Sequence, residues 1–337
     1  MIKTVHLGTF FFSIILFLFM WILFGWNTYT LDYDNYSVKF YDSDVYIQMG
    51  FVDIGYSYLN NFFYRLGYSF EEFRIIFSFF CLTLLYKIIF KQTLAPILVL
   101  IIYIFSIYCV DLVQMRNILA YLLCFSFLHL ILYENKRYRL FFAFIVLVCS
   151  TIHIGMLFYL IFSVVNIEKY YKIFPHLFIS LLMCLIFPGL SHSLVILSGV
   201  IVNDYLFSYS LNSLSISMLV LIFDVFVIKY FVRRGCGLNV YYPKYNLTSK
   251  YGIFIYNCNV LFLYLMPLVL MNMTFIRLLR NFYLINIIYI VNKLVVLKQE
   301  RNIADYLLFV FYVVDAFYFF VWIKGVISPL LQNNSFL

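Results

Sequence analysis

Long apolar runs separated by short polar connections dominate the pattern of this chain. Residues 7–26 follow Lys3 and are long enough to cross a bilayer, because about 20 helical residues at a rise of about 1.5 Å span its hydrocarbon core. No small-residue cleavage site follows this run, so we expect a retained anchor. Eight further runs predict transmembrane helices at about 73–90, 94–110, 117–133, 174–190, 214–232, 253–273, 279–297 and 303–323.

The apolar stretch 140–165 has two interpretations. It is either one long tilted span, or two short arms that meet near Ser150-Thr151-Ile152-His153, each reaching about 20 Å. With one span, 193–203 becomes an additional crossing. We favour the two arms, because they place Lys169 and Lys172 on the same side as the basic residues that precede 140. The pattern as a whole predicts an all-α polytopic membrane protein of about 10–11 transmembrane helices, forming a single transmembrane domain over 1–337, with a short helical hairpin near His153.

The polar stretch 27–72 stands out after the first span, because it holds seven of the fifteen acidic residues. The two-arm topology puts 16 of the 23 basic residues on the side of the N-terminus, which the positive-inside rule makes cytoplasmic. Four polar segments then share the outer face: 27–72, which we expect to be an acidic and aromatic loop region, and 111–116, 203–209 and 273–280.

Composition changes this picture little. The chain has 65% apolar residues, 11% charged residues and a mean hydropathy of +0.98, a composition that rules out a soluble globular protein. Because topology explains most of the formal net charge of +8, a nucleic-acid partner is not expected. The seven cysteines show no C-x-x-C or other ligand spacing, and we expect no metal site and no cofactor.

Three arginines lie at the outer ends of predicted spans, where the positive-inside rule disfavours them. Arg277 and Arg280 are three residues apart and would share one helix face, and Arg116 opens another span. A guanidinium fork matches phosphate oxygens, and the positive end of a helix adds to its field. These residues therefore suggest a diphosphate site at the membrane surface, although arginines that snorkel to lipid head groups have the same spacing.

His153 lies in an apolar setting beside Ser150, Thr151 and Gly155. A buried histidine that is merely hydrogen-bonded is one interpretation. Its unperturbed pKa near neutrality also permits a role as proton acceptor or as donor to a phosphate.

The loop 27–72 alternates carboxylates with tyrosines, as in Asp32-Tyr33-Asp34-Asn35-Tyr36 and Asp53-Ile54-Gly55-Tyr56. Carboxylates accept hydrogen bonds from sugar hydroxyls and aromatic rings pack on sugar C–H faces, but an ordinary solvated loop has the same composition. Calcium ligation by Asp32 with Asp34, or Asp42 with Asp44, lacks an EF-hand pattern.

Asp224 and Asp315 lie inside predicted spans, where a carboxylate is costly and suggests a function. They are candidates for the coupling acids of a transporter or for structural partners of neighbouring polar groups. A transporter needs polar groups through the membrane midplane in two related halves, and we find no internal repeat. The polar groups of this chain gather instead on one face.

The ordered set of these motifs resembles the EpsG/Wzy-type polysaccharide polymerases of bacterial capsule, O-antigen and exopolysaccharide systems. The resemblance is carried by the two Asp/Tyr elements, by Gln114-Met115-Arg116-Asn117-Ile118-Leu119-Ala120, by the histidine at Ser150-Thr151-Ile152-His153, by the tyrosines Tyr205 and Tyr209, and by Arg277 or Arg280 with Phe282 and Tyr283. The chain departs from the family pattern at Asp53, Asn117 and Gly155, where Glu, Gln and Ser are common.

The resemblance implies a polymerase in the bacterial cytoplasmic membrane, metal-independent, with polyprenyl-diphosphate-linked oligosaccharides as donor and acceptor. It implies Arg116, His153 and Arg277 as catalytic residues. The residues implied for substrate binding are Arg280, Gln114, Asp32, Tyr33, Tyr36, Asp53, Gly55, Tyr56, Tyr205 and Tyr209. A flippase and a chain-length regulator are the implied partners. The alternatives are a lipid-linked oligosaccharide flippase or another envelope glycosyltransferase or acyltransferase that uses polyprenyl-phosphate sugars.

Overall fold

The computed structural model describes residues 7–28, 32–50, 53–133, 135–198, 211–234, 249–297, 300–318, 332 and 334–335. Every regular element in these residues is helical, which confirms the all-α class. The longer and shorter α-helices are α1 (Leu7–Gly25), α2 (Tyr33–Tyr41), α3 (Ser43–Gln48), α4 (Ile54–Arg65), α5 (Phe70–Gln92), α6 (Pro96–Tyr103), α7 (Cys109–Asp111), α8 (Met115–Ser126), α9 (Lys136–Ile152), α10 (Ile173–Ser198), α11 (Leu211–Arg233), α12 (Ser249–Leu261), α13 (Met266–Met271), α14 (Arg277–Val296) and α15 (Ile303–Phe317). A π-helix (Ile104–Tyr108) joins α6 to α7, and the 3₁₀ helices are η2 (Leu128–Leu132), η3 (Ile154–Val164), η6 (Phe262–Leu265) and η7 (Met273–Ile276).

Helix ends follow local sequence signals. Ser69 caps α5 by accepting a hydrogen bond from the Glu72 N–H at 3.2 Å, while the Glu72 carboxylate accepts one from the Ser69 N–H at 2.8 Å. This reciprocal pair satisfies two N–H groups that a helix start otherwise leaves without partners. Asn135 caps α9 by accepting from the Arg137 N–H at 2.9 Å.

Six helices in the described residues are long and apolar enough to cross a membrane: Gly8–Gly25, Phe70–Gln92, Met115–Leu132, Ser215–Arg233, Lys250–Leu270 and Arg277–Val296. Shorter apolar helices occupy 96–111, 154–164 and 173–186. The chain is therefore a polytopic membrane protein. Of the ten or eleven predicted spans, several are broken by 3₁₀ or π segments, which shortens their continuous helices.

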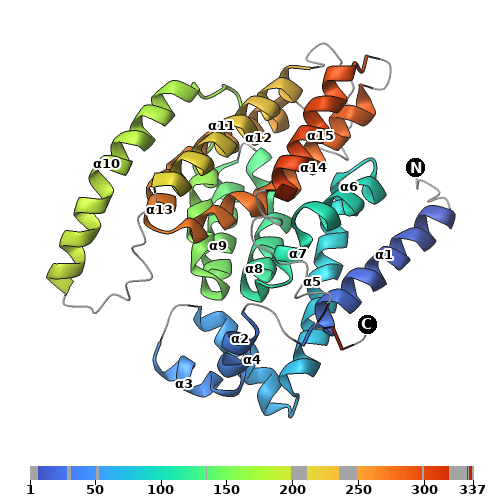
Figure 1. Ribbon diagram of the computed structural model, residues 1–337, viewed down its shortest axis with the longest axis vertical. Coiled ribbons are helices and arrows are strands. Elements are labelled where there is room, and N and C mark those ends of the chain that lie inside the picture. Colours follow the sequence, from blue (N-terminus) through green and yellow to red (C-terminus); the bar gives the residue numbers. More distant parts are fainter. Residues whose placement is uncertain are drawn as a thin grey trace. The chain divides into compact units, whose positions relative to one another are not determined.

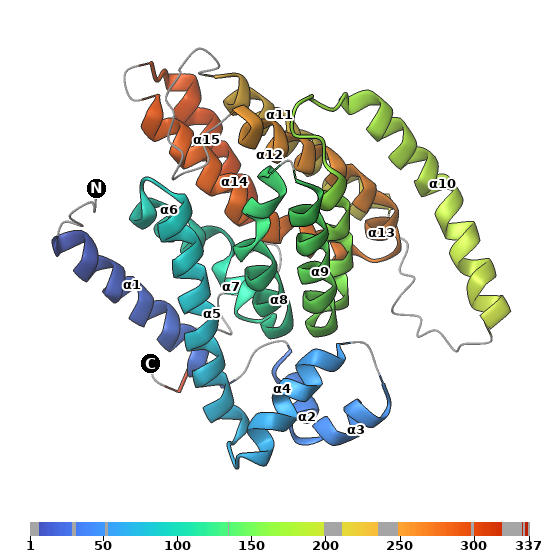
Figure 2. The same cartoon turned by 180° about the vertical axis from the view of Figure 1, so that it is seen from behind.

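The helices form two compact units, residues 1–163 with 309–337 and residues 164–308. In the first unit α1 packs on α5, α5 on α8, and α8 on α9. The short helices α2, α3 and α4 gather at one end of these helices, with α4 against α9 and α2 against α5 (Figures 1 and 2). In the second unit α11 packs against α12, α13 and α14, and α10 packs against α13.

The stretch 140–165 consists of two arms. α9 ends at Ile152, His153 has extended backbone angles (φ −148°, ψ 112°), and η3 begins at Ile154. The Arg139 guanidinium, near the start of α9, donates to the Ser163 carbonyl near the end of η3 at 3.4 Å, so the chain reverses at His153. The structure thus confirms the two-arm interpretation over a single continuous span.

The polar stretch 27–72 is largely helical, although its composition predicted a loop. Phe40 of α2 and Phe70 and Phe73 of α5 are fully buried, and the Phe40 and Phe73 rings stack with centroids 5.2 Å apart. Aromatic burial of this kind stabilises a layer of short helices that would not persist alone in water.

In the second unit, the buried Asp224 of α11 accepts a hydrogen bond from the Tyr283 hydroxyl of α14 at 2.6 Å. This contact favours the structural interpretation of Asp224 over a coupling acid. Tyr205 and Tyr209 lie outside the described residues.

Candidate functional site

Arg116 is the second residue of α8, and a buried polar cluster positions the turn before it. The Tyr103 and Tyr121 hydroxyls each donate to the Asp111 carboxylate at 2.7 Å, and the Gln114 N–H donates to the Asp111 carbonyl at 3.0 Å. Asp111 has no exposed surface. Because a buried carboxylate is costly without such donors, this cluster holds the turn, and Arg116 with it, in one place.

The Asp53 carboxylate joins three elements of the first unit. One oxygen accepts a hydrogen bond from Arg116 in an ion pair, and the other accepts from the Ile154 N–H at 2.8 Å. The His153 Nδ1 lies 3.9 Å from the same oxygen as Ile154. The starts of α4 and α8 and the His153 hairpin therefore meet at one carboxylate, and three of the predicted site residues lie together.

Asp53 has a left-handed backbone with φ 72°, the sole non-glycine residue with positive φ in the described chain. This conformation is sterically strained for residues other than glycine, although Asp and Asn tolerate it better than most. Such strain concentrates at functional sites, where surrounding contacts hold it in place. Here the ion pair and the Ile154 hydrogen bond hold it.

Tyr36 and Tyr56 form an aromatic wall beside Arg116. The Arg116 guanidinium carbon lies 5.4 Å from the Tyr36 ring centroid, and the two tyrosine rings meet edge to face at 5.9 Å. Burial raises the pKa of Tyr36, although the Arg116 charge opposes the shift, and burial raises the pKa of Tyr56 well above its usual value. Both hydroxyls are therefore neutral donors near pH 7, and within the described residues the buried Tyr56 hydroxyl has no hydrogen-bond partner.

Gly55 has a packing role. A Cβ on Gly55 would lie 2.4 Å from the Thr151 Oγ1 and 3.1 Å from the Thr151 carbonyl carbon, so only glycine lets α4 approach α9 this closely. This contact sets the distance between Asp53 and the His153 hairpin. The substrate-binding role that the family resemblance implies for Gly55 stays a prediction, and the structure adds this packing contact beside Asp53.

Lys39 is a further cation that feels the charge of Arg116, and its residue pattern does not mark it as functional. Burial, and secondarily the positive charge of Arg116, lower the pKa of the Lys39 amine, which places this second cation in the field of Arg116. Its signal in the sequence is weak, since it is a single lysine in an acidic stretch. However, Lys39 follows Tyr36 by three residues on α2, and this spacing puts both on one face.

The other predicted residues of 27–72 surround this cluster. Asp32 is the residue before α2. Its negative charge contributes in the upward direction to the pKa values of Tyr36 and Lys39. The Tyr33 hydroxyl donates to the Glu71 carboxylate at 2.6 Å and is thereby engaged at the start of α5. Asp44, one of the calcium candidates, pairs with Arg65 at 3.0 Å and accepts from Asn61 at 2.7 Å. No group of three or more His, Cys, Asp or Glu within the described ranges could hold a metal ion.

In the second unit, α14 begins at Arg277, so Arg277 and Arg280 lie in its first turn, as predicted. Arg280 is only 1% exposed. A snorkelling arginine keeps its charged head in solvent or among lipid head groups. The burial of Arg280 is therefore inconsistent with snorkelling at that position.

The geometry of the first unit provides a guanidinium, a histidine and a backbone N–H at one carboxylate, with tyrosine rings beside the guanidinium. Such a set can hold an anion and receive a proton nearby. Comparison with known proteins gives one result: the model of the EpsG family matches residues 10–334, nearly the whole chain. No curated protein sequence and no solved structure matches.

Proposed function

Because the chain belongs to the EpsG family, the family of Wzy-type polysaccharide polymerases, we propose that it joins polyprenyl-diphosphate-linked oligosaccharide repeat units into surface polysaccharide. The reaction takes place at the outer face of the bacterial cytoplasmic membrane, with the N-terminus in the cytoplasm. The observation that carries this proposal is the ion pair of Arg116 with Asp53, next to His153, at the polar end of apolar helices.

Arg116 binds the diphosphate of the donor. Its Nε is buried and donates no hydrogen bond within the described residues, while its other donors face Asp53 and Tyr36. A diphosphate displaces the Asp53 carboxylate from part of the guanidinium fork and accepts hydrogen bonds from it. Asp53 thus keeps Arg116 oriented before substrate arrives, and Lys39 adds a second positive charge.

The transfer step forms one bond and breaks one. The acceptor sugar hydroxyl attacks the anomeric carbon of the donor, the bond from that carbon to the diphosphate oxygen breaks, and polyprenyl diphosphate leaves with the bonding pair. The hydroxyl proton passes to His153, and Asp53, 3.9 Å from its ring nitrogen, stabilises the resulting imidazolium. Arg116 stabilises the negative charge that grows on the leaving diphosphate.

The remaining candidates fall into two groups. Arg277 and Arg280, in the second unit, are proposed to bind a phosphate group at the positive end of α14. The residues that we propose to bind sugars are Asp32, Tyr33, Tyr36, Tyr56, Gln114, Tyr205 and Tyr209. The partners that we propose are a flippase, which delivers the repeat units, and a chain-length regulator.

The test is to delete the gene in its host and resolve lipid-linked glycans by size, with plasmid copies of wild type, Arg116→Ala and Arg116→Lys. We expect single repeat units to accumulate on the outer leaflet and wild type alone to restore the ladder. Arg116→Lys should fail nearly as badly as Arg116→Ala, because a point charge does not replace a bidentate fork.

Arg65→Ala is the matched control, since Arg65 is an exposed arginine of the same unit that pairs with an exposed aspartate. It should restore the full ladder. Accumulation of repeat units on the inner leaflet would instead favour a flippase, and an unchanged polymer in the deletion strain would favour another envelope glycosyltransferase.

A further inference from the structure

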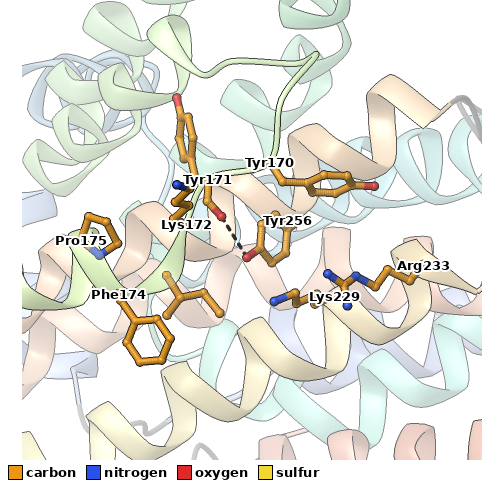
Figure 3. A pocket seen from close by; sticks show the side chains of 9 residues that line it. Tyr170, Tyr171, Lys172, Phe174, Pro175, Lys229, Arg233 and Tyr256 are labelled. Carbon is orange, nitrogen blue, oxygen red and sulfur yellow. Dashed lines mark hydrogen bonds between the residues drawn. The ribbon is translucent and has the colours of Figure 1, made fainter.

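A pocket of about 370 Å³ lies in the second unit, at the loop before α10 and along α11 and α12 (Figure 3). Three of the residues that line it are cations, Lys172, Lys229 and Arg233, and none is acidic. The others are Tyr170, Tyr171, Ile173, Phe174, Pro175 and Tyr256. The polymerase mechanism uses none of these residues.

A hydrogen-bond network around the buried Asn257 supports this pocket. Asn257, which has no exposed surface, donates to the Asn166 and Lys169 carbonyls at 2.7 and 2.8 Å and accepts from the Tyr171 N–H at 2.8 Å. The Tyr256 hydroxyl donates to the Tyr171 carbonyl at 3.1 Å, the contact drawn in Figure 3. The loop that carries Lys172 is therefore held in one conformation by its backbone.

The charges of this pocket are not neutralised within the described residues. Lys229 and Arg233 are four residues apart on α11, hence on one face, and neither they nor Lys172 form an ion pair there. Arg234, the next residue, is by contrast bound to Asp305 at 3.2 Å. The sequence 235–248 that follows contains no Asp or Glu.

The start of α10 strengthens the attraction for anions. Lys172 directly precedes this helix, whose first three residues, Ile173, Phe174 and Pro175, line the pocket. The N-terminus of a helix has partial positive charge and free N–H groups, which favour phosphate. Phe174, at the same edge, is 83% exposed and offers an apolar surface beside the cations.

We propose that this pocket binds the phosphate group of an anionic phosphate ester, with the head group of an anionic phospholipid as its natural source. The basic residues around it belong to the side that the positive-inside pattern makes cytoplasmic, where basic pockets between helices bind acidic lipids. The exposed Phe174 beside three cations fits a ligand with a charged head and an apolar tail.

The experiment measures lipid retention by native mass spectrometry of the purified full-length protein. The probes are dioleoylphosphatidylglycerol, zwitterionic dioleoylphosphatidylcholine and soluble glycerol 3-phosphate. Lys229→Gln/Arg233→Gln should weaken phosphatidylglycerol binding about 30-fold. Each basic residue near an acidic lipid contributes about 1 kcal/mol, and about 1.4 kcal/mol corresponds to a tenfold change in affinity. The charge-preserving Lys229→Arg/Arg233→Lys should stay within a few-fold of wild type.

The matched control is Lys136→Gln/Arg137→Gln, which removes two exposed cations of the same predicted side from the first unit. Equal losses in the pocket and control variants would show general surface attraction and overturn the proposal, as would no preference for either anionic probe over phosphatidylcholine. Binding of glycerol 3-phosphate that depends on the pocket residues would support the site and identify a soluble phosphate ester as its source. The readout is binding alone, so its failure is distinct from failure of the polymerase.

Discussion

A methyl group at Gly55 should separate α4 from α9 and thereby disturb the Asp53 carboxylate. In Gly55→Ala the new Cβ would lie 2.4 Å from the Thr151 Oγ1, which is about 1 Å less than a relaxed van der Waals contact. The Thr151 hydroxyl cannot turn away without cost, because it donates to the Val148 carbonyl at 2.8 Å. The Thr151 carbonyl carbon, 3.1 Å away, belongs to the backbone and resists displacement.

These distances indicate how large the losses of folding stability and polymerisation should be in Gly55→Ala. Overpacking of this kind costs about 1–3 kcal/mol of folding stability. A displacement of about 1 Å at the Asp53 hydrogen bond to Ile154 and its approach to His153 should lower polymerisation about 100-fold. Without the contact, alanine in a helix would raise stability by about 0.5–1 kcal/mol relative to glycine, so the sign of the effect is itself informative.

The assay compares the glycan ladder in the deletion strain with the thermal midpoint of the purified protein in detergent. Gly8→Ala is the control, because a Cβ there meets nothing within 4 Å. Gly55→Ala/Thr151→Ala should recover part of both losses, since it removes the 2.4 Å contact and leaves those at 3.1 Å. A normal ladder and an unchanged midpoint in Gly55→Ala would refute the close approach of α4 to α9.

Three further predictions concern single contacts. Asp53→Asn keeps the side-chain shape and the tolerance for positive φ but removes the charge that orients the Arg116 guanidinium. We expect the protein to accumulate at wild-type levels while the glycan ladder shortens. A full ladder would argue against a role of the ion pair. Tyr283→Phe leaves the Asp224 carboxylate without this donor, which should lower stability by about 1–3 kcal/mol with polymer still made, and loss of polymer in a stable variant would favour a coupling acid. Burial and the hydrogen bond to a carboxylate raise the pKa of Tyr33 from 10.0 to about 12. The contribution of the neutral Tyr33 hydroxyl to folding stability is therefore fully present below pH 10.0 and is lost as the pH rises toward about 12. The thermal midpoint of Tyr33→Phe should fall less over that interval, and parallel curves would contradict the shift.

Hydrophobic patterning and motifs suffice to predict the class of this protein and much of its local structure. Runs of apolar residues of membrane length lack any means to cover a soluble surface, so they predict helices in lipid, and the family resemblance carried by the ordered motifs was confirmed. Local signals also placed the break at His153 and the helix starts beside Arg116 and at Arg277. Each of these features depends on neighbours within a few residues.

Contacts between distant side chains depend on how the helices pack. Asp53 and Arg116 are 63 residues apart, and the helical periodicity of either segment defines a face without identifying the helix that packs against it. For this reason the sequence could not predict the ion pair of Asp53 with Arg116, the contact of Gly55 with Thr151, or the electrostatic effect of Arg116 on Lys39. The substrate-binding roles that the family resemblance implies for Asp53 and Gly55 stay predictions. Close packing of α4 on α9 brings these groups together, because only a fold in which a glycine meets Thr151 lets one carboxylate reach both Arg116 and the His153 hairpin.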